Sequence, residues 1–269
     1  MRRVQLRPVL RGPAVGVLCV ATLLTVLALT GDLSPVGWLT GLAAGVTGCA
    51  LLARGLARRV GGNGYRDVTG MGPADRVTLA RLVLTCGVAA LAAASLAQGG
   101  RGVALLVMLA TVAQLLDSVD GRVARRTSSV SELGARFDME TDAFLILVLS
   151  VYVADAMGWW VLAIGLARYA FLAAGWVWPW LRGTAPPRYW CKVVAVLQGA
   201  VLTLVVAGPL PALWETGLVT MALVLLTESF GREAWQLWER RPVIETWATG
   251  GEWGEPVAAG RVASGLSDA

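Results

Sequence analysis

Four aspartates stand close together between residues 117 and 142, beside some of the most apolar sequence in the chain. Asp117 and Asp120 are three residues apart, and Asp138 and Asp142 are four residues apart. On a helix, either spacing places both side chains on one face, so two neighbouring helices would bring two carboxylate pairs together. Such a cluster repels itself unless cations neutralise it. Because carboxylate oxygens are ligands of Mg²⁺ and Mn²⁺, the pattern predicts two divalent ions roughly 4 Å apart, an arrangement suited to phosphoryl transfer.

Small residues and an arginine accompany the aspartates. Gly121 and Ala124 follow the second aspartate, and Gly134 precedes the third by four residues. Small side chains leave room for a ligand or a second backbone to approach. Arg125 carries a fork of donors that suits a diphosphate. Together these residues predict a site for metal ions and a diphosphate.

The chain contains no histidine. A general base must therefore be a carboxylate, lysine, tyrosine, cysteine or water, and aspartate is the leading candidate.

The pattern resembles the signature of the CDP-alcohol phosphatidyltransferase family, D-x2-D-G-x2-A-R-x8-G-x3-D-x3-D. The chain matches it without a gap at Asp117, Asp120, Gly121, Ala124, Arg125, Gly134, Asp138 and Asp142. A second stretch, GPADRVTLARLVLT, is similar to the P-x-N-x-x-T-x-x-R start of the family's first core helix through Pro73, Thr78 and Arg81. Asp75 stands where asparagine is usual, and it would add an anion near the metal site.

The resemblance implies displacement at the β-phosphorus of a CDP-linked alcohol: an acceptor hydroxyl attacks, CMP leaves and a phosphodiester forms. It implies that Asp117, Asp120 and Asp138 are metal ligands and that Asp142 is the base, close enough to a metal to touch it. The other matched residues are implied to contact the nucleotide or diphosphate: Thr78, Arg81, Gly121, Ala124, Arg125 and Gly134. Asp75, at the position of the usual asparagine, is a candidate for the same role. The expected donor is CDP-diacylglycerol, in phospholipid biosynthesis. A CDP-amino-alcohol acting on diacylglycerol stays open, as does the identity of the acceptor.

Three basic residues later in the chain are candidates for acceptor binding. Arg168 lies inside an apolar run, where a charge is unfavourable and marks either a binding site or an ion pair, with Glu228 as one candidate partner. Arg188 and Lys192 stand at the start of the next run, where family members often have basic residues that hold an acceptor's phosphate. For this pair, snorkelling to the membrane interface is the alternative.

The composition is that of a membrane protein. Of the 269 residues, 56% are hydrophobic and 15% are charged, and the mean hydropathy is +0.64. Runs near the roughly 20 apolar residues that cross a bilayer recur along the chain. We predict eight spans, at about residues 13–30, 36–53, 77–98, 102–119, 139–158, 160–180, 191–208 and 213–230. The last six match the family's usual transmembrane core, so the predicted fold is an all-α integral membrane protein with two extra transmembrane helices before a six-helix core.

The arginines predict the orientation. With eight crossings, the N-terminus and every even-numbered loop lie on the same side of the membrane. Most of the loop arginines are on that side, whereas the four loops on the other side contain a single arginine, Arg101. The positive-inside rule then places the aspartates and both termini in the cytoplasm. The net charge of +5 suits anionic membrane lipids, and the absence of a basic soluble module argues against nucleic acid.

We divide the chain into three parts. Residues 1–60 form two N-terminal transmembrane helices outside the family core, residues 61–241 form the transferase domain, and residues 242–269 are expected to be a disordered cytoplasmic tail because they lack periodicity. The arginine-rich, lysine-poor composition suggests a bacterial cell membrane. The resemblance implies a homodimer.

Two other classes of protein use aspartates in membranes. Membrane prenyltransferases also combine Asp-rich motifs with Mg²⁺ and a diphosphate, but their two motifs lie far apart in sequence, whereas here all four carboxylates fall within one helix-loop-helix. A divalent-cation transporter would carry its carboxylates near the middle of the bilayer instead of at its cytoplasmic edge. The transporter stays open as the alternative from a different class.

Overall fold

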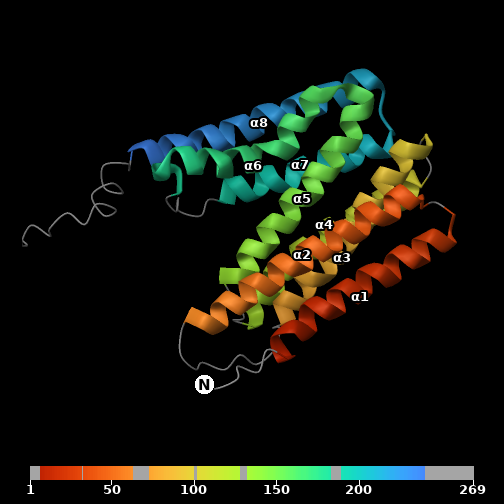
Figure 1. Ribbon diagram of the computed structural model, residues 1–269. Coiled ribbons are helices and arrows are strands. Elements are labelled where there is room, and N and C mark those ends of the chain that lie inside the picture. The colour runs from red at the N-terminus through yellow and green to blue at the C-terminus, as the bar shows by residue number, and fades with distance from the viewer. Residues whose placement is uncertain are drawn as a thin grey trace, which may run out of the picture.

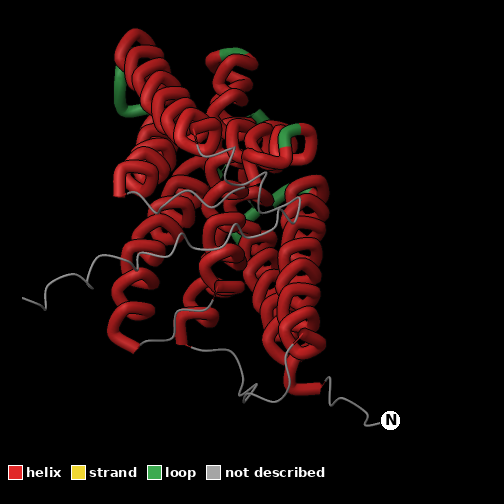
Figure 2. Tube along the Cα trace, turned by 90° about the vertical axis from the view of Figure 1, so that its left-hand side faces the viewer, coloured by secondary structure: helices red, strands yellow, loops and turns green. Residues whose placement is uncertain are grey.

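The computed structural model describes residues 7–31, 33–62, 73–99, 102–127, 132–182 and 189–239. The regular elements of these ranges are all helices, joined by short loops (Figure 2). The α-helices are α1 (Arg7–Leu29), α2 (Pro35–Gly62), α3 (Pro73–Gln98), α4 (Val103–Thr127), α5 (Glu132–Met157), α6 (Leu162–Val177), α7 (Tyr189–Ala207) and α8 (Ala212–Glu239). Two 3₁₀ turns, η1 (Trp159–Val161) and η2 (Pro179–Arg182), flank α6. The expected tail, residues 242–269, lies outside the described residues.

Every predicted apolar run is helical. Within the described residues, five segments are long and apolar enough to cross a membrane: Gly12–Leu29, Pro35–Gly55, Arg76–Gln98, Trp159–Val177 and Ala212–Glu239. Val103–Asp117 and Val193–Ala207 are shorter apolar segments. The N-terminal half of α5 carries several carboxylates, which lower its hydropathy. The predicted fold class, an all-α multi-pass membrane protein, is confirmed.

Helix α5 connects two groups of helices (Figure 1). One group is α1 to α4, in which α3 packs against α1, α2 and α4. The other is α6 to α8, in which α8 packs against α6 and α7. Since α5 contacts α3 on one side and α6 and α7 on the other, side chains from its two faces reach both groups.

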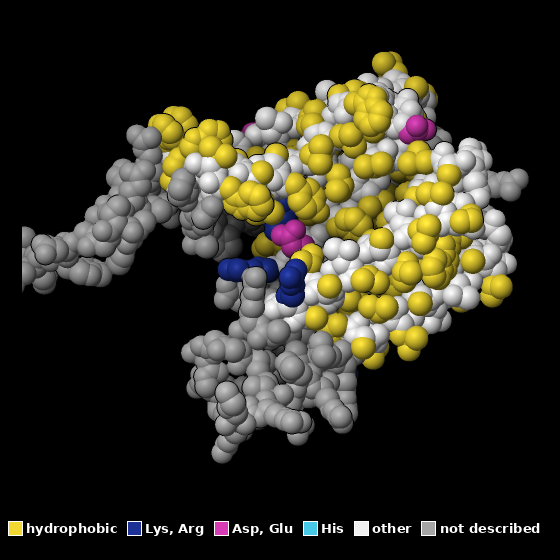
Figure 3. Space-filling view, in the orientation of Figure 1, with side chains coloured by type: hydrophobic (Ala, Val, Ile, Leu, Met, Phe, Trp, Pro, Cys, Tyr) yellow, Lys and Arg dark blue, Asp and Glu magenta, His cyan; other side chains and the backbone are white. Residues whose placement is uncertain are grey.

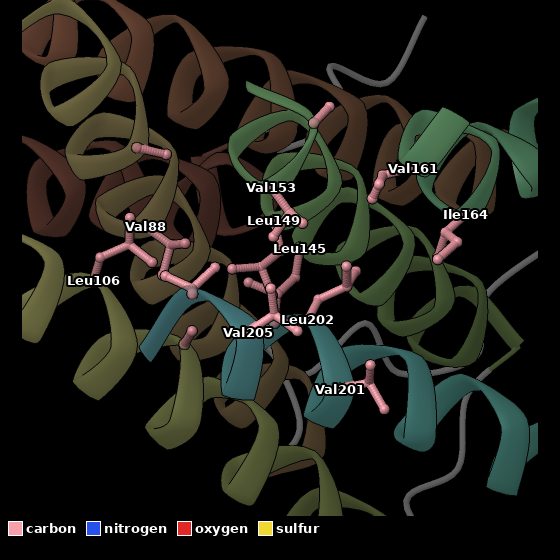
Figure 4. Close-up of a cluster of buried hydrophobic side chains, with 14 of the residues drawn as sticks. Val88, Leu106, Leu145, Leu149, Val153, Val161, Ile164, Val201, Leu202 and Val205 are labelled. Atoms are coloured by element: carbon pink, nitrogen blue, oxygen red, sulfur yellow. The ribbon is translucent and has the colours of Figure 1, made fainter. Parts of the chain in front are cut away.

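The larger core is aliphatic and fills the space between α3, α4, α5 and α7. Leu106, Leu149 and Leu202 are fully buried in it. Figure 4 shows Leu149 and Leu202 facing each other between α5 and α7. With little polarity in this core, dispersion contacts between closely fitting side chains hold the helices in place, as in other membrane proteins.

A second core joins the N-terminal helix pair to α3. Glycines on α2 let the backbones approach closely: a Cβ atom at Gly37 would lie 2.4 Å from the carbonyl oxygen of Ala90, and one at Gly41 would lie 2.8 Å from the Cβ of Ala90. Leu79 and Leu82 of α3 belong to this core, and Phe137 of α5 packs against it. The first two helices therefore contact residues that are neighbours in sequence of Arg81 and Asp138.

Candidate active site

Three of the four predicted carboxylates converge in space. Asp117 comes from α4, and Asp138 and Asp142 come from the first turns of α5, one helical turn apart. One oxygen from each side chain lies within 4.8 Å of the other two. We call these three residues the aspartate cluster. Its side chains are about one-third exposed, so the site is open to ligands at the edge of the bundle.

The rest of the signature surrounds this cluster along the backbone. Asp120, Gly121, Ala124 and Arg125 continue α4 beyond Asp117, but their side chains lie outside the described part of the structure. Gly134 is half-buried in the first turn of α5, four residues before Asp138. The predicted fourth carboxylate, that of Asp120, therefore has no described position.

Arg81 is the centre of the described charges. It lies on α3 with its side chain 1% exposed. Its Nη1 pairs with Asp117 at 3.0 Å and also with Asp138, and its Nη2 pairs with Asp142. Its Nε donates to the carbonyl oxygen of Ala113 at 3.3 Å. This role was not among the predictions from the sequence, although an arginine in an apolar span indicates a carboxylate partner.

The other residues of the GPADRVTLARLVLT stretch are partly described. Thr78 is buried one turn before Arg81 on α3, so it lies on the same side of the helix. The side chain of Asp75 lies outside the described part.

The donor set of the cluster fits a hard divalent ion. Ligand oxygens at roughly 2.1 Å from one Mg²⁺ are up to about 4.2 Å apart. The cluster oxygens are all within 4.8 Å of one another, so small side-chain rotations would bring them to that spacing. The aspartates also share one arginine between them, which shows that this position holds positive charge.

Arg168 forms an ion pair, but its partner is Glu140 and not Glu228, the partner considered from the sequence. Its Nη2 lies 2.5 Å from Oε1 of Glu140 on α5. Glu228 instead pairs with Arg232 and accepts a hydrogen bond from Trp190. The Nε of Arg168 is buried and has no hydrogen-bond partner among the described residues. Arg188 and the side chain of Lys192 lie outside the described part.

The charged residues lie in an otherwise apolar setting. In Figure 3, a small group of acidic and basic side chains lies between apolar surfaces of the molecule. Exposed leucines, valines and tryptophans cover the described helices on the outside, as expected where helices face lipid.

A comparison with protein families identifies the chain. A family model described as CDP-alcohol phosphatidyltransferase matches residues 71–228, which is more than half of the chain. The matched interval runs from the start of α3 into α8 and contains the whole aspartate signature. No curated protein and no solved structure matches significantly. The chain therefore belongs to the CDP-alcohol phosphatidyltransferase family, whose members are phosphotransferases for substituted phosphate groups.

Proposed function

We propose that this protein transfers the phosphatidyl group of CDP-diacylglycerol to an acceptor alcohol, with release of CMP, and that the reaction depends on two divalent ions, Mg²⁺ or Mn²⁺. Family membership implies transfer of a phosphatidyl group from a CDP-alcohol. The observation that carries the metal dependence is the convergence of Asp117, Asp138 and Asp142 in space. The signature that joins them in sequence spans the same residues.

The carboxylates divide into two roles. Asp117, Asp120 and Asp138 would hold the ions, which when bound spread the charge of the departing CMP and polarise the phosphorus. Asp142 takes the proton of the acceptor hydroxyl as the new oxygen–phosphorus bond forms and the bond to CMP breaks. The contacts with Arg81 support a separate role for Asp142. Asp142 pairs with Nη2 of Arg81, whereas Asp117 and Asp138 both pair with Nη1.

The donor would lie along α3, α4 and the start of α5. Gly121 and Ala124 follow the cluster along α4, and Gly134 precedes it on α5, so small residues border it in sequence on both sides. Arg125, Asp75 and Thr78 are proposed contacts of the nucleotide or diphosphate. Arg81 joins them when it is not engaged by the carboxylates.

The acceptor would be bound from the side of α6 and α7. Arg168 keeps its Nε without a hydrogen-bond partner among the described residues, while Glu140 fixes the other end of its guanidinium. A buried donor of this kind favours an anionic ligand such as a phosphate. Arg188 and Lys192 are proposed to complete the acceptor site.

The wider setting follows from the same proposal. We place the site at the cytoplasmic face of a bacterial cell membrane, with residues 61–241 as the transferase domain and residues 1–60 as an added helix pair. The loop arginines support this orientation. We also propose that the protein is a homodimer, as the family resemblance implies.

The direct test is CMP release by the purified full-length protein in detergent. The protein is incubated with Mg²⁺, CDP-diacylglycerol and, one at a time, inositol phosphate, glycerol phosphate, serine, an amino alcohol or a second phospholipid. CMP release with one acceptor is expected. Release only from a CDP-amino-alcohol with diacylglycerol would replace the donor. No release from any pair, combined with ion flux in vesicles, would favour the transporter.

A further inference from the structure

Arg81 is the one charged side chain in the buried class among the described residues. A buried guanidinium is stable only when its donors are satisfied. Here Nη1, Nη2 and Nε all have partners, and three of the four are carboxylates of the aspartate cluster. The side chain thus fills the middle of the cluster.

The position of Nη1 is the important one. Nη1 pairs with Oδ1 of both Asp117 and Asp138, so it occupies the position of a metal ion that would bind these two oxygens. A bound Mg²⁺ or Mn²⁺ contacts its ligand oxygens at roughly 2.1 Å and repels a neighbouring cation. The guanidinium and the ion therefore cannot occupy this position together.

The ratio of charges differs from that of a simple structural ion pair. One guanidinium pairs with three carboxylates in the aspartate cluster. A structural arginine in an apolar span needs only one carboxylate for neutrality. Arg81 therefore holds together more carboxylates than its own charge requires.

We propose that Arg81 is a resident counter-ion that competes with the divalent metal for Asp117 and Asp138. In the metal-free protein it prevents repulsion among the three carboxylates and holds them at short separations. Metal binding displaces it from these two residues, so Arg81 lowers the metal affinity that the carboxylates alone would have. The inference rests on the proposed function, because it takes the aspartate cluster to be the metal site.

The test compares Mn²⁺ binding to the full-length protein in detergent, measured by electron paramagnetic resonance of free Mn²⁺. Arg81→Gln removes the guanidinium charge and its fork. Arg76→Gln is the control, because Arg76 is an exposed arginine on the same helix. We expect Arg81→Gln to bind Mn²⁺ about tenfold more tightly than the wild type, since a like charge next to the ion is lost. Arg76→Gln should bind like the wild type.

Thermal unfolding gives a second readout that does not depend on activity. Metal-free Arg81→Gln should unfold at a lower temperature than the wild type, because its carboxylates repel one another. Saturating Mn²⁺ should raise the melting temperature of the variant by more than that of the wild type. If Arg81→Gln does not fold, Arg81→Met replaces it: this variant also removes the positive charge but keeps an unbranched side chain in the apolar surroundings, so its Mn²⁺ affinity should rise as well.

The outcomes separate the inference from the proposed function. Equal or weaker Mn²⁺ binding by Arg81→Gln, or by Arg81→Met in its place, would overturn the competition and make Arg81 a support for the ligands. If the wild type and the variants all fail to bind Mn²⁺, the metal site fails, and with it both the inference and the metal dependence of the proposed function.

Discussion

Asp142 differs from the other two members of the aspartate cluster in the contact it makes. Asp117 and Asp138 share Nη1 of Arg81, whereas Asp142 has Nη2 to itself. Under the proposed function, an ion between Asp117 and Asp138 would leave Asp142 beside it as the carboxylate that accepts the proton. The roles proposed for these residues, Asp117 and Asp138 as ligands together with Asp120, and Asp142 as the base, therefore need to be tested separately.

Replacement of Asp142 by asparagine should remove the base and keep most of the shape. We expect Asp142→Asn to lower the rate of CMP release by about 10² to 10⁴-fold, the usual contribution of a general base. Binding of CDP in the presence of Mg²⁺ should change little. Asp155→Asn is the matched control, because Asp155 is an exposed aspartate near the other end of α5. Wild-type turnover in Asp142→Asn would remove this residue from the proposed role.

Arg168 should affect the acceptor and not the donor. Arg168→Gln loses a charged donor, which typically contributes about 1.5 to 3 kcal/mol to a hydrogen bond with an anion. The KM for a phosphorylated acceptor should therefore rise about tenfold or more, while the KM for CDP-diacylglycerol stays near the wild-type value. The control is Arg232→Gln, which removes an exposed arginine that pairs with Glu228. An unchanged acceptor KM would leave the Arg168–Glu140 pair with a structural role only.

At the scale of elements, helix spacing explains what could and could not be predicted. Asp138 and Asp142 share a face because they are four residues apart, and the sequence alone gives that. Their meeting with Asp117 depends on how α4 and α5 pack. Glu140 lies between the two aspartates in sequence and so points to the other side of α5, where it meets Arg168. From the sequence alone, Glu228 was an equally reasonable partner for Arg168. Only the packing of α6 and α8 shows which faces of these helices the two side chains occupy.

Arg81 shows the same limit for long-range contacts. The family stretch predicts that it contacts the nucleotide or diphosphate, but its carboxylate partners are 36 to 61 residues away in sequence. Only the packing of α3 against α4 and α5 brings them together. Sequence patterns report local geometry well, whereas partners across helices follow from the packed core.

The close contact of α2 with α3 gives a prediction at this scale. Gly41→Ala would place a Cβ atom 2.8 Å from the Cβ of Ala90 and from a methyl group of Leu24. We expect a loss of about 1 to 3 kcal/mol in stability, because helices α1, α2 and α3 must separate to admit the methyl group. The measurement is thermal unfolding in detergent.

Gly217→Ala on α8 is the matched control for this substitution. A Cβ atom at Gly217 would meet no atom within 4 Å, so the change should be neutral or stabilise α8 by up to about 1 kcal/mol. Equal melting temperatures for the two variants would show that the N-terminal helix pair does not pack tightly on α3.

For the whole molecule, the carboxylates of the aspartate cluster on α4 and α5 repel one another, and Arg81 of α3 is attracted to all three. A ligand that binds only the folded state stabilises it by mass action, by about 2.7 kcal/mol at a concentration 100 times Kd. Mg²⁺ should therefore raise the melting temperature of the wild type, and a chelator should reverse the rise. Sodium at the same ionic strength is the control. An Asp138→Asn variant should lose most of the Mg²⁺ effect, and a full effect in that variant would place the ion elsewhere.

The most direct test of the whole account is anomalous diffraction at the manganese edge, from crystals of the full-length protein grown with Mn²⁺ and CDP. Two peaks about 4 Å apart are expected. At least one peak should contact oxygens of Asp117 and Asp138, with the diphosphate bound beside the ions and Arg81 moved away from these carboxylates. Bound CDP with no peak at the aspartate cluster would contradict a metal-dependent transfer at these residues.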